Sequence, residues 1–262
     1  MKIGLLDSGI GLLAAAAAVR GLRADAELVL ASDPAGMPWG PRSAEDVTRR
    51  ALECARAAAE EGLDALIVAC NTASVHALPA LRAAFEPRLP VIGTVPAIKP
   101  AAARHTTVAI WATPATTGSA YQRGLIADFG NGARITEVPC PGLAAAVETA
   151  DTDAVAAAVR AAAALTPPGV GAVVLGCTHY ELVAERISDA VPGAELYGSA
   201  QAVAGQALRR IGAGAPSGAA AASPGGVTVL QNGRRADRLP AVALAYPEGL
   251  ALAATPASAA TT

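Results

Sequence analysis

Short apolar runs alternate with longer alanine-rich stretches along most of the chain. The runs are rich in leucine or β-branched residues, and each is followed by a stretch of helical length. Eight of them lie at residues 3–6, 27–30, 65–69, 91–93, 108–111, 134–138, 172–175 and 194–197. This alternation predicts an α/β fold with mostly parallel sheets, and the nearly continuous apolarity of each run predicts strands buried on both faces.

Eight strands divide naturally into two sheets of about four strands each, flanked by helices. We place the seam near Thr94-Val95-Pro96. Residues 1–95 together with 206–250 then form a first α/β lobe, and residues 96–205 form a second.

The last part of the chain has a different composition. Residues 212–226 are rich in Gly, Ala, Pro and Ser and predict a flexible linker. Residues 227–231 and 235–245 predict one more strand and helix, and residues 251–262 predict a flexible tail.

Two segments, residues 64–72 and 171–179, share one plan. Each has an apolar strand, one small residue, a cysteine, two polar residues and then a helix. Cys70 and Cys177 therefore lie at the carboxyl ends of parallel strands, where open α/β sheets place their ligands. Because one segment falls in each lobe, we expect two pseudo-symmetric lobes with the active site in the cleft between them.

A cysteine at a helix N-terminus is favoured as the reactive thiolate. Two such thiols on opposite sides of a cleft can remove a proton from one face of a carbon and return one to the other face. That chemistry is racemisation or epimerisation, and it needs neither a metal nor another cofactor if the site stabilises a carbanion. We assign Cys54 and Cys140 to packing, because free cysteines are commonly buried.

Five motifs along the chain occur in a fixed order. They are Asp7-Ser8-Gly9, Pro38-Trp39-Gly40, Ala69-Cys70-Asn71-Thr72-Ala73-Ser74, Pro96-Ala97-Ile98-Lys99-Pro100 and Gly176-Cys177-Thr178-His179-Tyr180. This set resembles the glutamate racemases of the cofactor-independent aspartate/glutamate racemase superfamily, and the resemblance runs from about residue 2 to residue 210. It implies that Cys70 deprotonates the D-isomer and Cys177 the L-isomer, with the D-glutamate supplied to peptidoglycan synthesis.

The same resemblance implies further site residues. Asp7 would assist Cys70, and His179 and Glu148 would assist Cys177. The residues implied to bind the amino acid are Asp7, Ser8, Trp39, Gly40, Asn71, Thr72, Thr116, Thr178 and His179. The resemblance also implies a homodimer.

The chain departs from the family's usual pattern at a few places. Trp39 stands where the family usually has tyrosine, Leu12 where it has a second glycine and Ala14 where it has threonine, and residues 196–199 include no acidic residue. An indole donates a hydrogen bond only through its N–H, so Trp39 bears on the identity of the substrate side chain. Leu12, beside the Asp7 loop, is expected to narrow the cleft.

Composition narrows the function classes. In 262 residues, 20 Lys and Arg stand against 22 Asp and Glu without a basic cluster, which argues against a nucleic-acid partner. Charged residues interrupt the longest apolar stretches, and the N-terminus is unlike a secretory leader, so we expect a soluble, cytoplasmic protein without a membrane partner. Four cysteines in a chain of this length predict free thiols.

Three other readings stay open. Residues 9–14 match the dinucleotide fingerprint G-x-G-x-x-A, with Asp33 placed as a ribose-binding acid, which would make the protein an NAD-binding oxidoreductase. A non-catalytic binding protein and a racemase of aspartate or another amino acid are the other two. Cys177-x-His179 and Cys70-x5-His76 supply possible metal ligands but lack an accompanying C-x2-C pair, so we expect no metal, and we place His76 and His105 at the surface or at helix ends.

Overall fold

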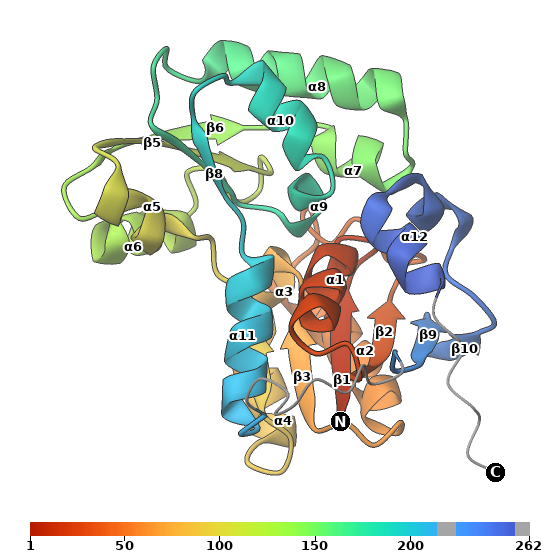
Figure 1. Ribbon diagram of the computed structural model, residues 1–262. Coiled ribbons are helices and arrows are strands. Elements are labelled where there is room, and N and C mark those ends of the chain that lie inside the picture. The colour runs from red at the N-terminus through yellow and green to blue at the C-terminus, as the bar shows by residue number, and fades with distance from the viewer. Residues whose placement is uncertain (214–223, 255–262) are drawn as a thin grey trace. The chain divides into compact units, whose positions relative to one another are not determined.

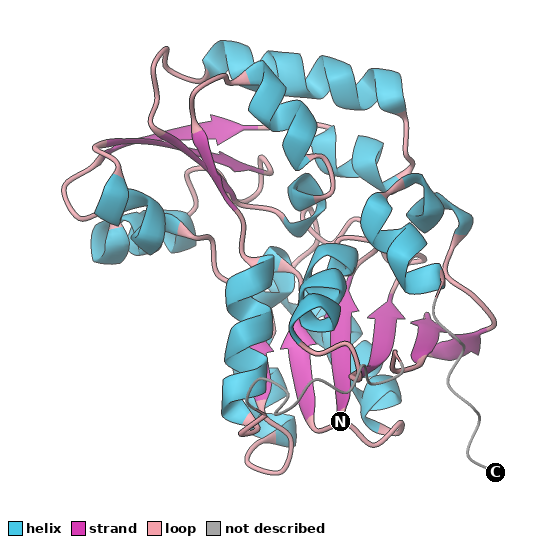
Figure 2. Cartoon of the chain, viewed as in Figure 1, coloured by secondary structure: helices cyan, strands magenta, loops and turns pink. Residues whose placement is uncertain are grey.

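The computed structural model describes residues 1–213 and 224–254, and the chain forms two compact units. The first comprises Met1–Thr94 and the described residues from Ala200 onward, and the second is Val95–Ser199. Each unit has its own sheet, with helices on both faces (Figures 1 and 2).

The first unit is built on a six-stranded sheet in the order β10-β9-β2-β1-β3-β4. Its strands are β1 (Lys2–Asp7), β2 (Glu27–Ser32), β3 (Ala65–Val68), β4 (Val91–Gly93), β9 (Val227–Gln231) and β10 (Arg234–Ala236). All neighbours pair in parallel except β10 with β9. The central strand β1 places Leu6 opposite Ala31 of β2 and Val68 of β3.

Helices cover both faces of this sheet. They are α1 (Leu12–Leu22), α2 (Ala44–Ala59), α3 (Asn71–His76), α4 (Leu78–Phe85), α11 (Ala200–Arg210) and α12 (Pro247–Ala253), with a 3₁₀ helix η1 (Ala241–Ala245). In Figure 1, α1 and α11 lie side by side in front of the sheet, with α2 behind it. The buried alanines of α1, Ala15, Ala16 and Ala18, allow this close approach.

The second unit is built on a four-stranded, fully parallel sheet in the order β6-β5-β7-β8. Its strands are β5 (Thr107–Ala112), β6 (Arg134–Pro139), β7 (Ala172–Leu175) and β8 (Glu195–Tyr197). Its helices are α5 (Ile98–Arg104), α6 (Ala120–Phe129), α7 (Leu143–Glu148), α8 (Thr152–Leu165), α9 (Thr178–Glu181) and α10 (Ala184–Ala190). One apolar core cluster joins α5 and α6 to this sheet.

The two sheets repeat one strand order. The order β2-β1-β3-β4 of the first unit recurs as β6-β5-β7-β8 in the second. The eight predicted strands and the α/β class with two parallel sheets are confirmed. The additional strand predicted at 227–231 is confirmed as β9. The first sheet has more than the predicted four strands, because β9 joins the outer edge of β2 and β10, which was not predicted, folds back onto β9.

The C-terminal part differs from the sequence-based boundaries. Residues 205 and 206, where we expected the second lobe to end, both lie inside α11, whose buried residues Val203, Ala204, Ala207 and Leu208 attach the whole helix to the first unit. The helix predicted at 235–245 is shorter, because β10 takes its first two residues and only Ala241–Ala245, after Pro240, form a 3₁₀ helix. Residues 251–253 belong to α12 and not to a tail.

The rest of the predicted tail, 255–262, and most of the predicted linker, 214–223, lie outside the described residues. Residues 224–226 run beside the start of β2, where Leu28 N donates to Gly226 O at 3.0 Å. Within 1–213 and 224–254, no helix has the length and apolarity that crossing a bilayer requires.

Candidate active site

Cys70 lies between the end of β3 and the start of α3. Its backbone is extended, with φ −146° and ψ 121°, and it is the N-cap of α3. Ala69 N donates to Leu6 O of the neighbouring strand at 2.8 Å, and Ser74 N donates to Cys70 O at 2.9 Å. These two bonds fix the cysteine at the carboxyl end of its strand, with 6% of its surface exposed.

Cys177 occupies the corresponding place after β7. Its φ of −143° and ψ of 135° nearly equal those of Cys70, and it is the N-cap of α9. Gly176 N donates to Trp111 O at 2.8 Å, as Ala69 does in the first unit, and Tyr180 N donates to Cys177 O at 3.0 Å. The strand, cysteine and helix predicted for both segments are thus confirmed in the backbone.

An imidazole and a carboxylate accompany Cys177. The Cys177 Sγ lies 3.9 Å from His179 Nδ1, and His179 Nε2 lies 2.9 Å from Glu148 Oε2. His179 is 3% exposed, so the imidazole is shielded while it contacts both partners. This chain of three groups can pass a proton between sulfur and imidazole, with the carboxylate holding the ring.

A buried carboxylate ends the strand beside β3. Asp7, the last residue of β1, is fully buried, and its Oδ1 accepts a hydrogen bond from Ser8 Oγ at 3.0 Å. Asp7 follows Leu6, and Cys70 follows the Ala69 that donates to Leu6, so both functional groups emerge at one edge of the sheet.

Asn71 has a side chain without partners among the described residues. It is 6% exposed, yet neither its Oδ1 nor its Nδ2 makes a hydrogen bond there. A buried amide with no partner costs about 1–3 kcal/mol, so its presence directly after Cys70 points to a polar ligand. Thr72 beside it is half-buried, and Thr178 holds the matching place after Cys177 with 5% exposure.

Thr116 lies in the loop after β5, half-buried, with its Oγ1 3.2 Å from Thr113 Oγ1. Gly118 N in the same loop donates to Glu137 Oε2 at 2.7 Å. Because β5 and β7 are neighbours, this loop and Cys177 share the carboxyl edge of the second sheet.

The Trp39 side chain has a packing role. It is 1% exposed in the core of the first unit, and its Nε1 donates to Asp33 Oδ2 at 3.0 Å. This bond uses the only hydrogen-bond donor of the indole, so Trp39 could donate to a substrate only through its main chain. Gly40, which follows it, is half-buried.

Leu12 is 3% exposed and lines a small internal cavity together with Leu239 and Pro240. Its side chain therefore packs within the first unit, beside the Asp7 loop.

Comparisons with known proteins match this arrangement. Residues 12–207 match the family model for Asp/Glu/Hydantoin racemases. The chain belongs to this racemase family. It is 34% identical over 216 residues to a glutamate racemase of Pseudomonas entomophila, covering 80% of this chain and 81% of that protein. It is 37% identical to one of a Roseiflexus species, covering 71% and 70%.

Solved racemase structures have the same fold. The crystal structure of Escherichia coli glutamate racemase in complex with L-glutamate and the activator UDP-MurNAc-ala superposes with a TM-score of 0.75 at 31% identity, covering 87% of this chain and 88% of that one. A Thermus thermophilus glutamate racemase gives a TM-score of 0.66 at 31% identity, covering 88% and 87%. The resemblance inferred from the five motifs is confirmed.

The other two cysteines of this racemase-family chain are core residues. Cys54 and Cys140 are 4% and 1% exposed. Burial raises the pKa of each thiol to about 12, so both stay protonated at neutral pH. Their assignment to packing is confirmed.

The acidic residue that an NAD-binding site would need, Asp33, is already engaged by other groups of the protein. Asp33 Oδ1 accepts from Gly36 N at 3.1 Å, and its Oδ2 accepts from Trp39 Nε1 and, at 2.9 Å, from Arg50 Nη1. A carboxylate engaged in this way, with 6% exposure, is a structural anchor and not a ribose ligand.

The remaining histidines lie where we expected them. His76 is exposed at the end of α3, and His105 caps α5 and lies 3.0 Å from Glu195. Within the described ranges, no three His, Cys, Asp or Glu side chains group together as a metal site.

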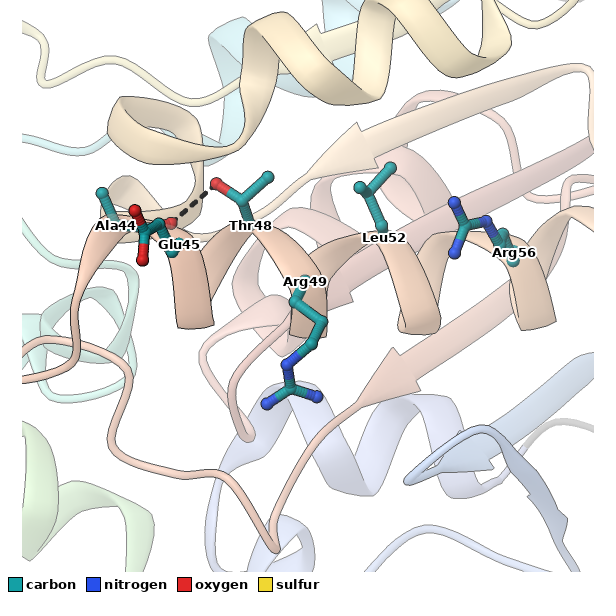
Figure 3. Close-up of a pocket in the computed structure, with 6 residues that line it drawn as sticks. All are labelled: Ala44, Glu45, Thr48, Arg49, Leu52 and Arg56. Atoms are coloured by element: carbon teal, nitrogen blue, oxygen red, sulfur yellow. Dashed lines mark hydrogen bonds between the residues drawn. The ribbon is translucent and has the colours of Figure 1, made fainter.

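A hollow of about 480 Å³ lies along α2, and no predicted site residue lines it. It is lined by Ala44, Glu45, Thr48, Arg49, Leu52 and Arg56, and Figure 3 shows Thr48 and Leu52 projecting from the same side of the helix.

Sequence reasoning missed the residues that hold the two cysteine segments. In the first unit, Thr94 N donates to Ser74 Oγ at 2.9 Å, and Thr94 Oγ1 donates to Val68 O at 2.8 Å, which ties the ends of β3 and β4 together. In the second unit, Tyr180 OH donates to Cys140 O at 3.4 Å, and Glu181 accepts from Ser199. Ser74 and Tyr180 belong to the motifs around Cys70 and Cys177, but the spacing of those motifs does not indicate that their side chains bond to Thr94 and Cys140.

Proposed function

We propose that this chain interconverts L- and D-glutamate by a two-thiol, two-base mechanism that needs no pyridoxal phosphate. The observation that supports it best is the matched backbone of Cys70 and Cys177 at corresponding strand ends of two units with the same strand order. Membership of the racemase family and relatives named glutamate racemase support the same conclusion.

In the proposed reaction, the substrate Cα lies between the two sulfurs. The Cys177 thiolate takes the α-proton of L-glutamate, so the Cα–H bond breaks and an S–H bond forms. The resulting carbanion is stabilised by hydrogen bonds to its carboxylate. Cys70, as a thiol, gives its proton to the opposite face, which produces D-glutamate and leaves Cys70 as thiolate. The reverse reaction uses the thiols in exchanged roles.

Each thiol has its own means of handling the proton. His179 Nδ1, 3.9 Å from the Cys177 sulfur, takes the thiol proton before the reaction, and Glu148 stabilises the imidazolium that forms. Asp7, at the strand end beside Cys70, does the same work for that cysteine directly.

The substrate is proposed to bind through neutral donors. Hydroxyl and amide groups of Ser8, Asn71, Thr72, Thr116 and Thr178, with main-chain donors near Trp39 and Gly40, would hold its carboxylates. Asp7 would lie beside its ammonium group, and the His179 imidazolium beside a carboxylate. Hydrogen bonds to ionised groups are about twice as strong as neutral ones, so such a set can bind two carboxylates without an arginine. The unpartnered amide of Asn71 supports this assignment.

The test is α-proton exchange in deuterium oxide, followed by NMR with L- or D-glutamate. Cys70→Ser and Cys177→Ser should each lower racemisation by about 10²- to 10⁴-fold, the usual contribution of a general acid or base. Cys70→Ser should still exchange the α-proton of L-glutamate, and Cys177→Ser that of D-glutamate. Racemisation at the wild-type rate in either variant would refute the two-base scheme.

We further propose that the enzyme acts in the cytoplasm as a homodimer and supplies D-glutamate for peptidoglycan. The activator named with the E. coli relative, UDP-MurNAc-ala, carries the muramic acid of that polymer and supports the link. Sedimentation of the purified chain across a concentration series measures the oligomeric state, and a single monomer species throughout would refute the dimer.

A further inference from the structure

The one-turn helix after Cys177 is held by three consecutive side chains. α9 has four residues, too few to be stable by itself. His179 contacts Glu148 on α7, Tyr180 OH donates to Cys140 O after β6, and Glu181 accepts hydrogen bonds from Ser199 after β8. Because Thr178 and His179 belong to this turn, its orientation fixes where the imidazole stands relative to the Cys177 sulfur.

Of these three side chains, Glu181 accepts two hydrogen bonds from a single residue. Its Oε1 accepts from Ser199 N at 2.8 Å and from Ser199 Oγ at 2.7 Å. Ser199 is itself 3% exposed, and Glu181 is half-buried, so both bonds are partly shielded from water. Hydrogen bonds to a charged group are stronger than neutral ones, and this carboxylate receives two from one residue.

The chain around Ser199 is shaped to receive this carboxylate. A Cβ added at Gly198 would lie 2.5 Å from Glu181 Oε2 and 2.9 Å from its Cδ. Glycine at 198 therefore leaves the space that the carboxylate occupies. Ser199 is also the last residue of the second unit, and the chain enters α11 of the first unit at Ala200.

From these contacts we propose that Glu181 is a positioning residue for the Cys177 half-reaction. Its carboxylate anchors α9 to Ser199 and so keeps the His179 imidazole at its position beside the Cys177 sulfur. This inference rests on the proposed function. It assigns Glu181 no contact with the substrate. Its loss should therefore lower the rate of proton removal by Cys177 and leave substrate binding and the Cys70 half-reaction unchanged.

Overall racemisation cannot show which half-reaction is slowed, because a racemase with an equilibrium constant of one has equal kcat/KM in both directions. The experiment therefore measures α-proton exchange by each cysteine separately. Glu181→Ala is placed in a Cys70→Ser background, where exchange of L-glutamate reports Cys177, and in a Cys177→Ser background, where exchange of D-glutamate reports Cys70. We expect L-exchange to fall about tenfold or more, equivalent to the loss of one charged hydrogen bond, and D-exchange to stay within about twofold.

Three variants serve as comparisons. Glu181→Gln retains an oxygen that can accept from Ser199 N, so it should restore most of the L-exchange. Ser199→Ala removes only the hydroxyl and should lower L-exchange less than Glu181→Ala, which keeps the proposal testable if Glu181→Ala fails to fold. Glu185→Ala, which removes an exposed carboxylate from the first turn of α10, should change neither rate.

A second readout does not depend on turnover. Cys177 is half-buried, and its alkylation by iodoacetamide can be followed by mass spectrometry across pH. In Glu181→Ala the midpoint of this profile should move to higher pH, because a displaced His179 takes the thiol proton less readily. A wild-type enzyme that exchanges neither enantiomer would refute the proposed function, and the alkylation profile would still test Glu181. Equal loss of L- and D-exchange, or an unchanged alkylation profile, would overturn the positioning role.

Discussion

The segments around Cys70 and Cys177 have one backbone and two different sets of proton partners. Both cysteines are extended N-cap residues, and the residue before each donates to the neighbouring strand at 2.8 Å. The strand neighbour of the first segment ends in Asp7, whereas the corresponding residue in the second unit is Ala112. The second unit has its carboxylate on α7 instead, at Glu148, and the imidazole of His179 stands between it and the sulfur.

This difference shows what the repeated fold fixes and what it leaves variable. The repeated strand order fixes where a thiol emerges, because the carboxyl end of a parallel strand meets the start of a helix there. It does not fix how that thiol loses its proton. The first unit places a buried carboxylate at the adjacent strand end, and the second uses an imidazole held by a carboxylate from another helix. In the proposed mechanism each thiol both takes and gives a proton, so the two sets of partners perform the same task by different chemistry.

The largest effect in this comparison is expected at Asp7. Asp7→Asn keeps the shape and the hydrogen bond from Ser8 but removes the charge. We expect racemisation to fall about 10²- to 10⁴-fold, because the variant lacks the base that serves Cys70. At saturating L-glutamate, exchange of its α-proton in a Cys70→Ser background should fall much less, since Cys177 has its own partners and the variant loses only the contact of Asp7 with the substrate ammonium group.

The matched control for Asp7 is Asp64→Asn. Asp64 lies at the other end of the same sheet, where its Oδ2 accepts from Lys2 N at 2.8 Å. It should leave racemisation at the wild-type level. Racemisation by Asp7→Asn at the rate of Asp64→Asn would show that Cys70 needs no carboxylate from β1.

The backbone of both cysteine segments was predictable from sequence, and their partners were not. An apolar run followed by a small residue, a cysteine and polar residues specifies a strand end locally. The pairing of His179 with Glu148 joins residues 31 positions apart, and only the family resemblance indicated it. The engagement of Trp39 by Asp33 and of Glu181 by Ser199 depends on side-chain packing between separate elements, which periodicity does not encode. The strand at 227–231 was predicted, but for the same reason its pairing with β2 was not.

A smaller effect is expected at Glu148, because it acts on Cys177 through His179. Glu148→Gln keeps a hydrogen bond to Nε2 and removes the charge that stabilises the imidazolium. The loss should be about 10- to 100-fold in racemisation, the equivalent of the 1.5–3 kcal/mol typical of a hydrogen bond to a charged group.

The pH profile of the Glu148→Gln variant separates a charge effect from a packing effect. If the charge matters, the limb that reports His179 moves to lower pH, because the imidazolium has lost its stabilising partner. Exchange of D-glutamate in a Cys177→Ser background should not change. A reduced rate with an unshifted profile would contradict the electrostatic role and would reduce Glu148 to a packing residue.

The smallest effect concerns the buried cysteine that each unit also contains, Cys54 in the first and Cys140 in the second. Burial raises the pKa of both thiols to about 12 from an ordinary value of 9.0. The unfolded chain therefore releases these protons at lower pH than the folded one. The stability that the neutral thiols contribute is complete below about pH 9 and is lost as the pH rises toward about 12.

The free energy of unfolding by urea should accordingly decline between about pH 9 and about pH 11, and the decline should be shallower in a Cys54→Ala/Cys140→Ala double variant. Racemisation by that variant should stay within about twofold of the wild type, since neither thiol takes part in the reaction. Brief alkylation of the native enzyme near neutral pH should modify Cys177 and leave Cys54 and Cys140 untouched. Modification of Cys140 as fast as Cys177 would mean that burial does not distinguish the reactive thiol from the packing thiol in the second unit. The assignment of one catalytic and one packing cysteine to each unit would then be wrong for the second unit.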